Sequence, residues 1–463
     1  MITVDDHPER RGVRQEWPSP TLHICPAARG IACLALGLWI TREPAMNRFS
    51  TLPSPAVPTS TGLVRDSSAT SSAAGRAGLL HSHPSAASPL AGRVSLAHDY
   101  LLVMRGAERT FAAIADLYAE APIFTLLHDE QGTNGRFAAR SVTTSPVQRL
   151  GMDQSTFRGL LALYPLAIER LKLPQSDVVL SSSSAFAHGV RVPDGAVHIC
   201  YCHTPFRYAW DEESYALGEI SPLLRPLLRP LLRRIRTWDL SASRRVDSYI
   251  ANSQLTRERI KRHYARDAPV IHPPVETHRF APGSPGDSLL IVSEILRHKR
   301  LHLALEAARR ARAPIQVVGA GPHHAALRDA YPEAEFLGRV SDEDLAELYA
   351  SARAVLMPGM EEFGITAVEA QAAGRPVIAA AAGGALETVL DGQTGRLARL
   401  DDVDSFVRAI EGIEELDFDP AHAVQNAERF SVAAFERRLS AHVRGVLERR
   451  DHRSHARPRH DPL

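Results

Sequence analysis

The chain has 463 residues, and its 54 Lys and Arg residues nearly balance its 53 Asp and Glu residues, which gives a formal net charge of +1. This near-neutrality excludes a generally basic nucleic-acid-binding protein and an acidic tail protein. With 44% hydrophobic and 23% charged residues the chain can bury a core, and its length predicts two or three domains. Only three of the 54 cations are lysines, namely Lys172, Lys261 and Lys299, which we interpret as codon bias.

The four cysteines and the apolar runs indicate neither a metal site nor a membrane span. Neither cysteine pair, 25 with 33 or 200 with 202, has the C-x-x-C spacing of a zinc or redox motif. The apolar stretch at 31–40 is about half of the roughly 20 residues that a span needs. It is followed by no convincing cleavage site, so no signal peptide is predicted. We therefore expect a cytoplasmic protein.

Residues 1–92 differ in composition from the rest of the chain. From 51 to 92 the sequence consists mostly of Ser, Thr, Pro, Ala and Gly and has no apolar periodicity. Such a segment cannot bury enough surface to offset its ordering entropy, so a disordered extension is predicted. Met46 could be the true start, and whether residues 1–45 are translated stays open.

From residue 93 short apolar runs alternate with helical segments, which is the pattern of a parallel sheet covered on both faces. A first domain is predicted over 93–275, with strands at 93–98, 122–127, 177–181, 197–202, 248–251 and 269–272. Its helices are expected at 107–119, 156–171 and 256–264. The stretch 272–287 is rich in Pro and Gly and is interpreted as an interdomain linker.

A second alternating array predicts a second domain over 288–430. Its strands are expected at 288–292, 315–318, 334–337, 354–357, 376–380 and 395–397, and its helices at 301–311, 342–350, 366–373, 385–390 and 403–411. The fold class is therefore α/β, with two doubly wound domains whose ligands bind at the carboxyl ends of the strands, across a cleft. An amphipathic helix at 431–449 is expected to pack back on the first domain, and 450–463 is predicted to be a disordered tail.

The most informative segment is 357–378. A strand ends at Met357, a loop with Pro and Gly follows, and a helix begins near Gly364. Glu361 lies in the loop and Glu369 lies just over a turn into the helix. The helix N-terminus offers unpaired N–H groups and partial positive charge to a phosphate. Because the two carboxylates can accept hydrogen bonds from sugar or ribose hydroxyls on either side, the segment predicts a nucleotide-sugar site.

This segment resembles the E-x7-E motif of retaining glycosyltransferase family 4, whose members have the GT-B fold of two Rossmann-like domains. The resemblance extends over about residues 93–448 and looks closest to bacterial mannosyltransferase-like members. The stretches that carry it are 98–100, 105–108, 202–211, 250–253, 298–300, 318–322, 336–341 and 383–387. It implies a metal-independent enzyme without a cofactor that moves a hexosyl group, with GDP-mannose as the hypothesised donor, to a glycan or lipid-linked acceptor.

Carried over position by position, the resemblance implies three catalytic residues. Glu361 would contact hydroxyls of the donor sugar, Lys299 would bind the diphosphate, and His203 would lie near the donor sugar and the acceptor. The implied donor-binding positions, with Glu369 holding the ribose, are Gly106, Gly319, Gly321, Gly338, Arg339, Val340, Phe363, Gly364, Ile365 and Glu369. His98 and Asp99 end the first strand and are acceptor-side candidates.

Several of these residues have a structural alternative that the sequence leaves open. Gly319 and Gly321 are equally typical of a tight turn after a strand. His98 and Asp99, the two acceptor-side candidates, could instead have a structural role and cap backbone groups near the end of the first strand. One of Glu361 and Glu362 is expected to be a solvated loop charge, and Glu387 is explained as well by a helix dipole as by a ligand.

Two acidic features bear on charge at the site. Glu294 stands where the wider family often has an Arg, and it would repel a diphosphate by about 4 kcal/mol at roughly 4 Å and an effective dielectric constant of about 20. Either Glu294 points away, or Arg297 or Arg300 compensates. The stretch 342–344 has the letters of a metal-binding D-x-D motif, but it follows Ser341, so we expect a capped helix start instead.

The segment 222–238 carries Arg225, Arg229 and Arg233 on one helical face beside leucines. Two interpretations stay open: an ordinary amphipathic helix that packs on the sheet, or a helix that contacts the inner face of the membrane. Pro226 and Pro230 are expected to weaken a continuous helix here. The alternative functions are a UDP-sugar-dependent transferase, a GT-B-like nucleotide-sugar epimerase and a non-catalytic sugar-nucleotide-binding protein.

Overall fold

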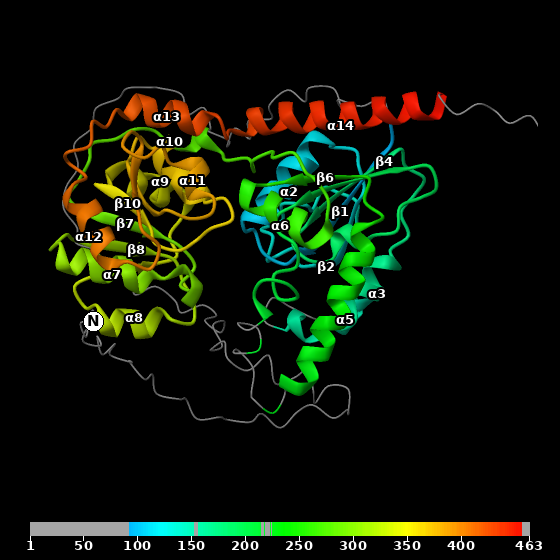
Figure 1. Ribbon diagram of the computed structural model, residues 1–463, viewed down its shortest axis with the longest axis horizontal. Helices are drawn as coiled ribbons and strands as arrows, with labels where there is room; N and C mark the ends of the chain where they lie inside the picture. The colour runs from blue at the N-terminus through cyan, green and yellow to red at the C-terminus, as the bar shows by residue number, and fades with distance from the viewer. Residues whose placement is uncertain (1–91, 152–155, 214–216, 218–222, 224, 456–463) are drawn as a thin grey trace, which may run out of the picture.

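The protein is described by a computed structural model that covers residues 92–151, 156–213, 217, 223 and 225–455 (Figure 1). The predicted N-terminal extension up to residue 91 and the last eight residues of the predicted tail, 456–463, lie outside the described residues. Residues 450–455, predicted as part of that tail, instead continue the last helix. Among the described residues, no helix is long and apolar enough to cross a membrane.

The first domain is built on a six-stranded parallel sheet in the order β3-β2-β1-β4-β5-β6. The strands are β1 (Val94–Leu101), β2 (Ile123–His128), β3 (Val142–Thr144), β4 (Val178–Ser183), β5 (Val197–Cys202) and β6 (Ser248–Ala251). The strand order reverses at β1, which lies between β2 and β4. Ligands of doubly wound sheets bind in the crevice at such a switch point, next to the carboxyl ends of the strands.

Helices cover both faces of this sheet. They are α2 (Gly106–Leu117), η2 (Pro146–Leu150), η3 (Phe157–Leu160), α3 (Tyr164–Glu169), η4 (Ala187–Gly189), α5 (Arg225–Ser243) and α6 (Gln254–Tyr264). The predicted helix at 156–171 is wrong as one element: it consists of η3 and α3 with a break at 161–163, and Pro165 stands in the first turn of α3, where its missing N–H costs no bond. The predicted strand at 269–272 is also wrong: it forms only an isolated bridge between Ala251 and Val270.

The second domain repeats the pattern with the strand order β12-β11-β10-β7-β8-β9. Its strands are β7 (Leu289–Val292), β8 (Ile315–Val318), β9 (Glu335–Gly338), β10 (Ala354–Met357), β11 (Val377–Ala380) and β12 (Gly395–Ala398). Its helices are η6 (Thr277–Arg279), η7 (Arg297–Lys299), α7 (Leu301–Arg310), α8 (His324–Ala330), α9 (Asp342–Ser351), α10 (Ile365–Ala372), α11 (Ala385–Thr388), α12 (Val403–Glu411) and α13 (Pro420–Glu428). The two α/β domains confirm the predicted fold class.

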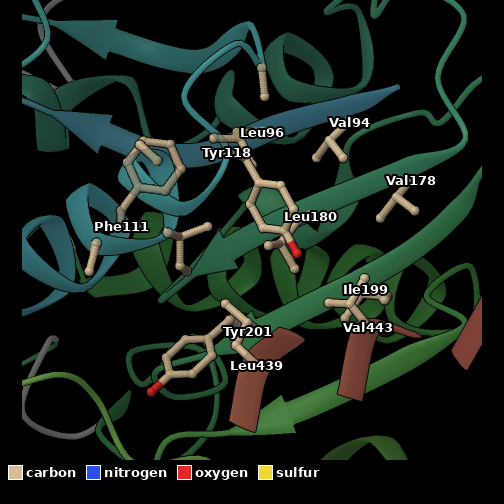
Figure 2. Close-up of a cluster of buried hydrophobic side chains, with 14 of the residues drawn as sticks. Val94, Leu96, Phe111, Tyr118, Val178, Leu180, Ile199, Tyr201, Leu439 and Val443 are labelled. Atoms are coloured by element: carbon tan, nitrogen blue, oxygen red, sulfur yellow. The ribbon is translucent and has the colours of Figure 1, made fainter. Parts of the chain in front are cut away.

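The last helix, α14 (Val432–His455), leaves the second domain and packs on the first sheet (Figure 1). Its apolar residues Phe435, Leu439 and Val443 join the core beside α2, as Figure 2 shows for the last two. Burying each such side chain contributes about 1.5–3 kcal/mol. His442 adds a hydrogen bond of 2.9 Å between its Nε2 and the Oγ of Ser248 in β6.

Candidate active site

The loop between β10 and α10 is shaped by glycines that bring distant segments together. Gly364 caps α10 with φ of +87°, and a side chain there would lie 3.0 Å from the Cε of Met357. A Cβ on Gly359 would lie 2.9 Å from the carbonyl oxygen of Lys299. The loop backbone therefore lies against the end of η7, which only residues without side chains allow.

This close approach brings two of the predicted catalytic residues into contact. The Nζ of Lys299 donates to both carboxylate oxygens of Glu361, at 2.7 and 2.5 Å. The side chains are 21% and 20% exposed, so the ion pair lies partly out of water at the start of α10. A cation, a carboxylate and the first N–H groups of a helix thus share one small region, which suits a phosphate bound next to a hydroxyl-bearing group.

Glu362, the next residue, is paired across the cleft with the first domain. It lies 3.3 Å from Arg207 and 3.1 Å from the buried Arg259. Burial raises the pKa of Glu362, but the charges of Arg207 and Arg259 outweigh that effect and lower it below its ordinary value. The prediction that one of Glu361 and Glu362 is a solvated loop charge is therefore wrong, because both are paired.

Arg259 connects the two domains at the site, and the sequence did not reveal it. Its Nη1 donates to the Oγ1 of Thr204 at 3.0 Å and to Glu362 at 3.1 Å. Thr204 follows His203, so one guanidinium links the strand end that carries the predicted active-site histidine to the Glu361–Glu362 loop. In the sequence Arg259 is one of several cations on a basic helix, and only its burial distinguishes it.

His203 and His98 lie together at the carboxyl ends of the first sheet. Both are buried, and burial lowers the pKa of each to about 3. The Nε2 of His203 lies 2.9 Å from the Oγ of Ser182, and the Nδ1 of His98 lies 3.1 Å from the same oxygen. Sequence reasoning placed the two histidines at the same edge but missed Ser182, which bridges them.

Asp99 has the contacts of a cap. Its carboxylate accepts hydrogen bonds from the backbone N–H groups of residues 184–187, at distances of 2.5 to 3.0 Å, and from the Ser183 hydroxyl at 3.3 Å. These donors surround a carboxylate that is 3% exposed. The capping alternative therefore describes Asp99, whose acceptor-side role stays a prediction without a contact to support it.

Glu369 lies within α10 with a separate partner from that of Glu361. The hydroxyl of Tyr349 donates to its Oε2 at 2.7 Å. Burial raises the pKa of Glu369, although this hydrogen bond and the charges of Arg109 and Arg279 act in the opposite direction. The two carboxylates of the E-x7-E motif thus stand in different environments, one beside a cation and one beside a phenol.

The remaining predicted donor-binding positions fall at the same cleft or support it. A Cβ on Gly106 would lie 3.2 Å from Ile365, so the first loop of the first domain reaches the start of α10. Gly319 and Gly321 lie against the carbonyl oxygens of Ser293 and Ile295, so the loop after β8 packs closely on the loop that leads to Lys299. Their contact with a donor stays a prediction. In β9 and beyond, Gly338 has φ of +69°, Arg339 is exposed and Val340 is half-buried.

Phe363 is buried rather than open to the cleft. It is 4% exposed and packs against His272 and Phe430, with ring centroids 5.4 and 5.3 Å apart. Only its backbone remains for the predicted contact with a donor.

Glu387, for which a helix dipole and a ligand were both open, forms hydrogen bonds with the first domain. Its carboxylate accepts from the N–H of Gln254 at 2.8 Å and lies 2.8 Å from the Nε2 of His272.

The charge of Glu294 is compensated by a residue that the sequence did not indicate. Its carboxylate pairs with Arg105 of the first domain at 2.8 Å. Arg300 pairs instead with Asp401. Arg105, across the cleft, therefore compensates the charge of Glu294 in place of the expected Arg297 or Arg300.

The stretch 342–344 forms the start of α9, which is capped by the Ser341 hydroxyl. This confirms the predicted helix start.

Residues of both domains line a cavity of about 150 Å³ at this place. Its walls include Arg207, Arg259, Lys299, Glu361 and Glu362. Among the described residues, no group of three or more His, Cys, Asp or Glu side chains is placed to hold a metal ion. The cavity is lined by paired charges, a setting in which polar groups of a ligand can exchange with protein partners.

Two family models match the chain in succession. One described as "Glycosyltransferase Family 4" matches residues 104–279, and one described as "Glycosyl transferases group 1" matches residues 275–430. Together they span both domains and the cleft between them.

Curated relatives are about one third identical to part of the chain within the aligned regions. The D-inositol 3-phosphate glycosyltransferase of Streptomyces bingchenggensis is 34% identical over 233 residues, which cover 40% of this chain and 50% of the relative. The protein of the same name from Mycobacterium sp. strain KMS is 32% identical over 244 residues, with 46% and 55% covered. The chain thus spans about half the length of the curated relatives it matches.

Solved structures share the fold. Anabaena Alr3699/HepE in complex with UDP superposes with a TM-score of 0.55 at 18% identity, covering 76% of this chain and 100% of that one. Sucrose-phosphate synthase from Thermosynechococcus elongatus gives a TM-score of 0.56 at 16% identity, covering 77% and 100%. At these identities the likeness establishes the two-domain architecture alone.

Proposed function

The chain belongs to glycosyltransferase family 4, and on that premise we propose that it is a retaining glycosyltransferase that moves a hexosyl group from a nucleotide sugar to a glycan or lipid-linked acceptor. The observation that carries the proposal is the Lys299–Glu361 pair at the start of α10, with Nζ to oxygen distances of 2.7 and 2.5 Å. Arg259 bonds to Glu362, the neighbour of Glu361, and to Thr204, the neighbour of His203, and so connects this pair to the strand end that carries His203.

In the proposed reaction the Lys299–Glu361 pair separates as the donor enters. The ammonium turns to the diphosphate, and the carboxylate accepts hydrogen bonds from hydroxyls of the donor sugar. The bond from the anomeric carbon to the diphosphate oxygen breaks as the bond to the acceptor oxygen forms, and the acceptor's proton passes to the leaving diphosphate oxygen. The leaving diphosphate is stabilised by Lys299 and by the N–H groups at the start of α10, which point at developing negative charge without reorganising. A retaining transfer by this route needs neither a covalent carboxylate nucleophile nor a metal, and we propose that the protein uses neither.

We propose GDP-mannose as the donor, on the resemblance to mannosyltransferase-like members, with a UDP-hexose as the alternative. Two observations widen the panel: the Anabaena neighbour was solved with UDP, and the curated relatives are named for D-inositol 3-phosphate. The assay therefore combines GDP-mannose, UDP-glucose and UDP-N-acetylglucosamine with mannosyl, inositol phosphate and polyprenyl phosphate acceptors. It measures nucleoside diphosphate release, transfer and the anomeric configuration of the product.

Site variants decide whether the cleft carries the activity. Lys299→Ala, Glu361→Gln and His203→Ala are expected to lower transfer by about a hundredfold or more, as for loss of a group that stabilises transition-state charge. Lys261→Ala, at an exposed position on α6, is the matched control and should leave transfer unchanged. Unchanged transfer in all three site variants would contradict the assignment. An altered sugar released without transfer would indicate an epimerase, and binding without turnover a non-catalytic protein.

The face of the first domain around α3 and α5 supports contact with a membrane. Exposed leucines gather there, at positions 150, 163, 166, 223 and 227, with exposed fractions of 44% to 89%. On α5 the side chains of Leu232 and Ile235 are buried against the sheet. The predicted arginines 225, 229 and 233 are exposed, as is Arg234, and Arg229 lies 3.8 Å from Glu213. The expectation that Pro226 and Pro230 weaken a continuous helix is wrong, since α5 runs unbroken from Arg225. Pro226 stands in the first turn, where no N–H bond is needed, and Pro230 lies inside the helix without ending it.

We propose that this face docks on anionic lipid, in keeping with a lipid-linked acceptor in cell-envelope assembly. Changing residues 225, 233 and 234 from Arg to Gln should weaken sedimentation with phosphatidylglycerol vesicles by about a hundredfold, at about 1 kcal/mol per Arg. Binding to phosphatidylcholine vesicles should be weak throughout. The control variant changes the same number of exposed arginines in the second domain, at 312, 328 and 408. Equal losses in both variants would contradict the proposed face.

A further inference from the structure

Ser182 lies between two buried histidines at the carboxyl ends of three neighbouring strands. His98 belongs to β1, Ser182 stands opposite it in the register of β4, and His203 follows β5. Ser182 is 1% exposed, His98 1% and His203 8%. The proposed reaction assigns a role to His203, but it gives Ser182 none.

The hydrogen bonds around Ser182 can be counted unambiguously. The Nδ1 of His98 lies 3.0 Å from the carbonyl oxygen of Ser182, which can only accept, so this nitrogen carries a hydrogen. The same N–H lies 3.1 Å from the Ser182 hydroxyl oxygen. The hydrogen of that hydroxyl must therefore go elsewhere, and the acceptor it has among the described residues is the Nε2 of His203, at 2.9 Å.

The count fixes the tautomer of His203. An Nε2 that accepts a hydrogen bond carries no hydrogen, and burial lowers the pKa of His203 to about 3, so the neutral ring keeps its single proton on Nδ1. Burial acts on His98 in the same direction, which leaves it neutral with its proton on Nδ1 as well. The His98 N–H is thus shared between the carbonyl and hydroxyl oxygens of Ser182, and the Ser182 hydroxyl donates to His203.

The ring of His98 and the backbone of His203 are held in place on the two sides of Ser182. His98 stacks on Phe111 with ring centroids 4.6 Å apart and an interplanar angle of 17°. The N–H of His203 donates to the carbonyl oxygen of Ser183 at 2.9 Å, and its carbonyl oxygen accepts from the hydroxyl of Thr256 at 2.9 Å. The hydroxyl of Ser182 therefore meets a histidine whose backbone is fixed, and the ring orientation depends on the hydrogen bond to Nε2.

We propose that Ser182 is a positioning residue that holds His203 in the Nδ1-protonated tautomer, with His98 orienting the Ser182 hydroxyl. This inference rests on the proposed transferase function. In this tautomer His203 offers a substrate oxygen a hydrogen-bond donor at Nδ1, while Nε2 is occupied by Ser182 and is not free to act as a base. His203 then orients a hydroxyl of the donor sugar or acceptor and removes no proton from it.

Ser182→Ala is a clean test because His98 keeps its bond to the backbone carbonyl of residue 182. Nitrogen-15 NMR of histidine-labelled full-length protein reads the tautomer, with His203→Asn to assign the signal. The wild type should show a protonated Nδ1 and an unprotonated Nε2 at His203, and Ser182→Ala should lose this preference. In the transfer assay kcat should fall by about ten- to a hundredfold with the donor KM little changed, as for a misplaced group, and Ser182→Thr should restore it.

Ser181→Ala is the matched control. Ser181 is the preceding residue on β4, equally buried, and its hydroxyl lies 2.8 Å from the Nε2 of a different histidine, His198. This variant should keep both the tautomer of His203 and kcat. A protonated Nε2 at His203 in the wild type, or equal kcat losses for Ser181→Ala and Ser182→Ala, would overturn the proposal. An inactive wild type with the expected tautomer would instead contradict the transferase function and leave the role of Ser182 in place.

Discussion

Glu108 is a carboxyl group whose surroundings set a pH range for stability. It stands in the first turn of α2 and accepts a hydrogen bond of 3.2 Å from the N–H of Arg105, closing a capping box. Burial raises the pKa of Glu108 from 4.5 to about 7, against the lowering effect of the N–H groups and the Arg105 charge. The folded state therefore binds a proton at this position more tightly than the unfolded chain does.

The sign of the pH effect follows from linkage. Because the folded pKa of Glu108 is raised, its contribution to stability is fully present below about pH 4.5 and is lost as the pH rises through about 7. Glu108→Gln, which still accepts from Arg105, should therefore gain in Tm relative to the wild type between pH 4.5 and 8. Glu120→Gln, at an exposed position in the same domain, should show a constant difference. A constant difference for Glu108→Gln would contradict the raised pKa.

At this scale the sequence located the charged residues of the site but not their partners. Lys299 and Glu361 were predicted from a motif and a helix start, and the structure brings them into contact. Arg259 and Ser182 were missed because their roles depend on neighbours that come from distant segments. Arg105 was likewise not expected to neutralise Glu294, since that contact forms across the cleft.

The start of α10 depends on a glycine that no other residue replaces without strain. Gly364 has φ of +87° and its Cβ position is crowded by Met357, whereas Gly392 has φ of +78° with open space around it. Ala at either position should cost about 1–2 kcal/mol of unfolding free energy for the left-handed backbone. Gly364→Ala should also lose the thermal shift that a nucleotide sugar gives, and Gly392→Ala should keep it. Equal thermal shifts would mean that the start of α10 does not bind the donor.

Buried strands were predicted from the sequence more accurately than strands at the edge of a sheet. Strands buried on both faces are mostly apolar, and β5, β6, β8 and β10, with at most one His, Ser or Gln each, were predicted with their observed bounds. The edge strand β3 (Val142–Thr144) was missed because it is short and two of its three residues are threonines. The run at 269–272 has the composition of a strand, but it begins with Pro269 and is followed by Pro273. Because proline cannot donate a hydrogen bond to a neighbouring strand, the pairing is limited to one bridge.

Over the whole molecule, the cleft is closed by ion pairs of different burial. The Arg259 side chain, paired with Glu362, is 7% exposed, whereas Arg105 and Glu294 are 44% and 41% exposed. The interdomain linker also lies beside the segment that joins α13 to α14, where the N–H of Val275 donates to the carbonyl oxygen of Phe430 at 2.9 Å. The buried pair should therefore govern closure, and the exposed pair should add little.

This difference predicts unequal effects of two otherwise similar substitutions. Glu362→Gln leaves Arg259 without its cross-cleft carboxylate and should lower the free energy of unfolding by about 1–3 kcal/mol, as for hydrogen bonds to charged groups. It should also increase the radius of gyration in small-angle X-ray scattering. Glu294→Gln should cost less than about 1 kcal/mol, the range for exposed pairs, and leave the scattering unchanged. A larger effect for Glu294→Gln would contradict this account of closure.

The domain arrangement was accessible from the sequence because each array carries its own alternation of strands and helices. The apolar spacing of the last helix also indicated a face to be buried, and Phe435, Leu439 and Val443 fill the core beside α2. The ion pairs that close the cleft could not be predicted in this way, since cations and carboxylates on separate domains have no common pattern in the chain. Their partners follow only from the folded geometry.

The most direct test of the donor site is the transfer rate of Lys299→Arg. Lys299 is one of three lysines among 54 cations, and its compact ammonium contacts both oxygens of Glu361. The backbone of Gly359 packs closely against that of Lys299. A guanidinium is larger and planar, so kcat/KM for the donor should fall by about a hundredfold, as for a misplaced group. Lys261→Arg should match the wild type. Wild-type kcat/KM in Lys299→Arg alone would show that any cation suffices there. Wild-type kcat/KM in both Lys299→Arg and Lys299→Ala would contradict the proposed donor site.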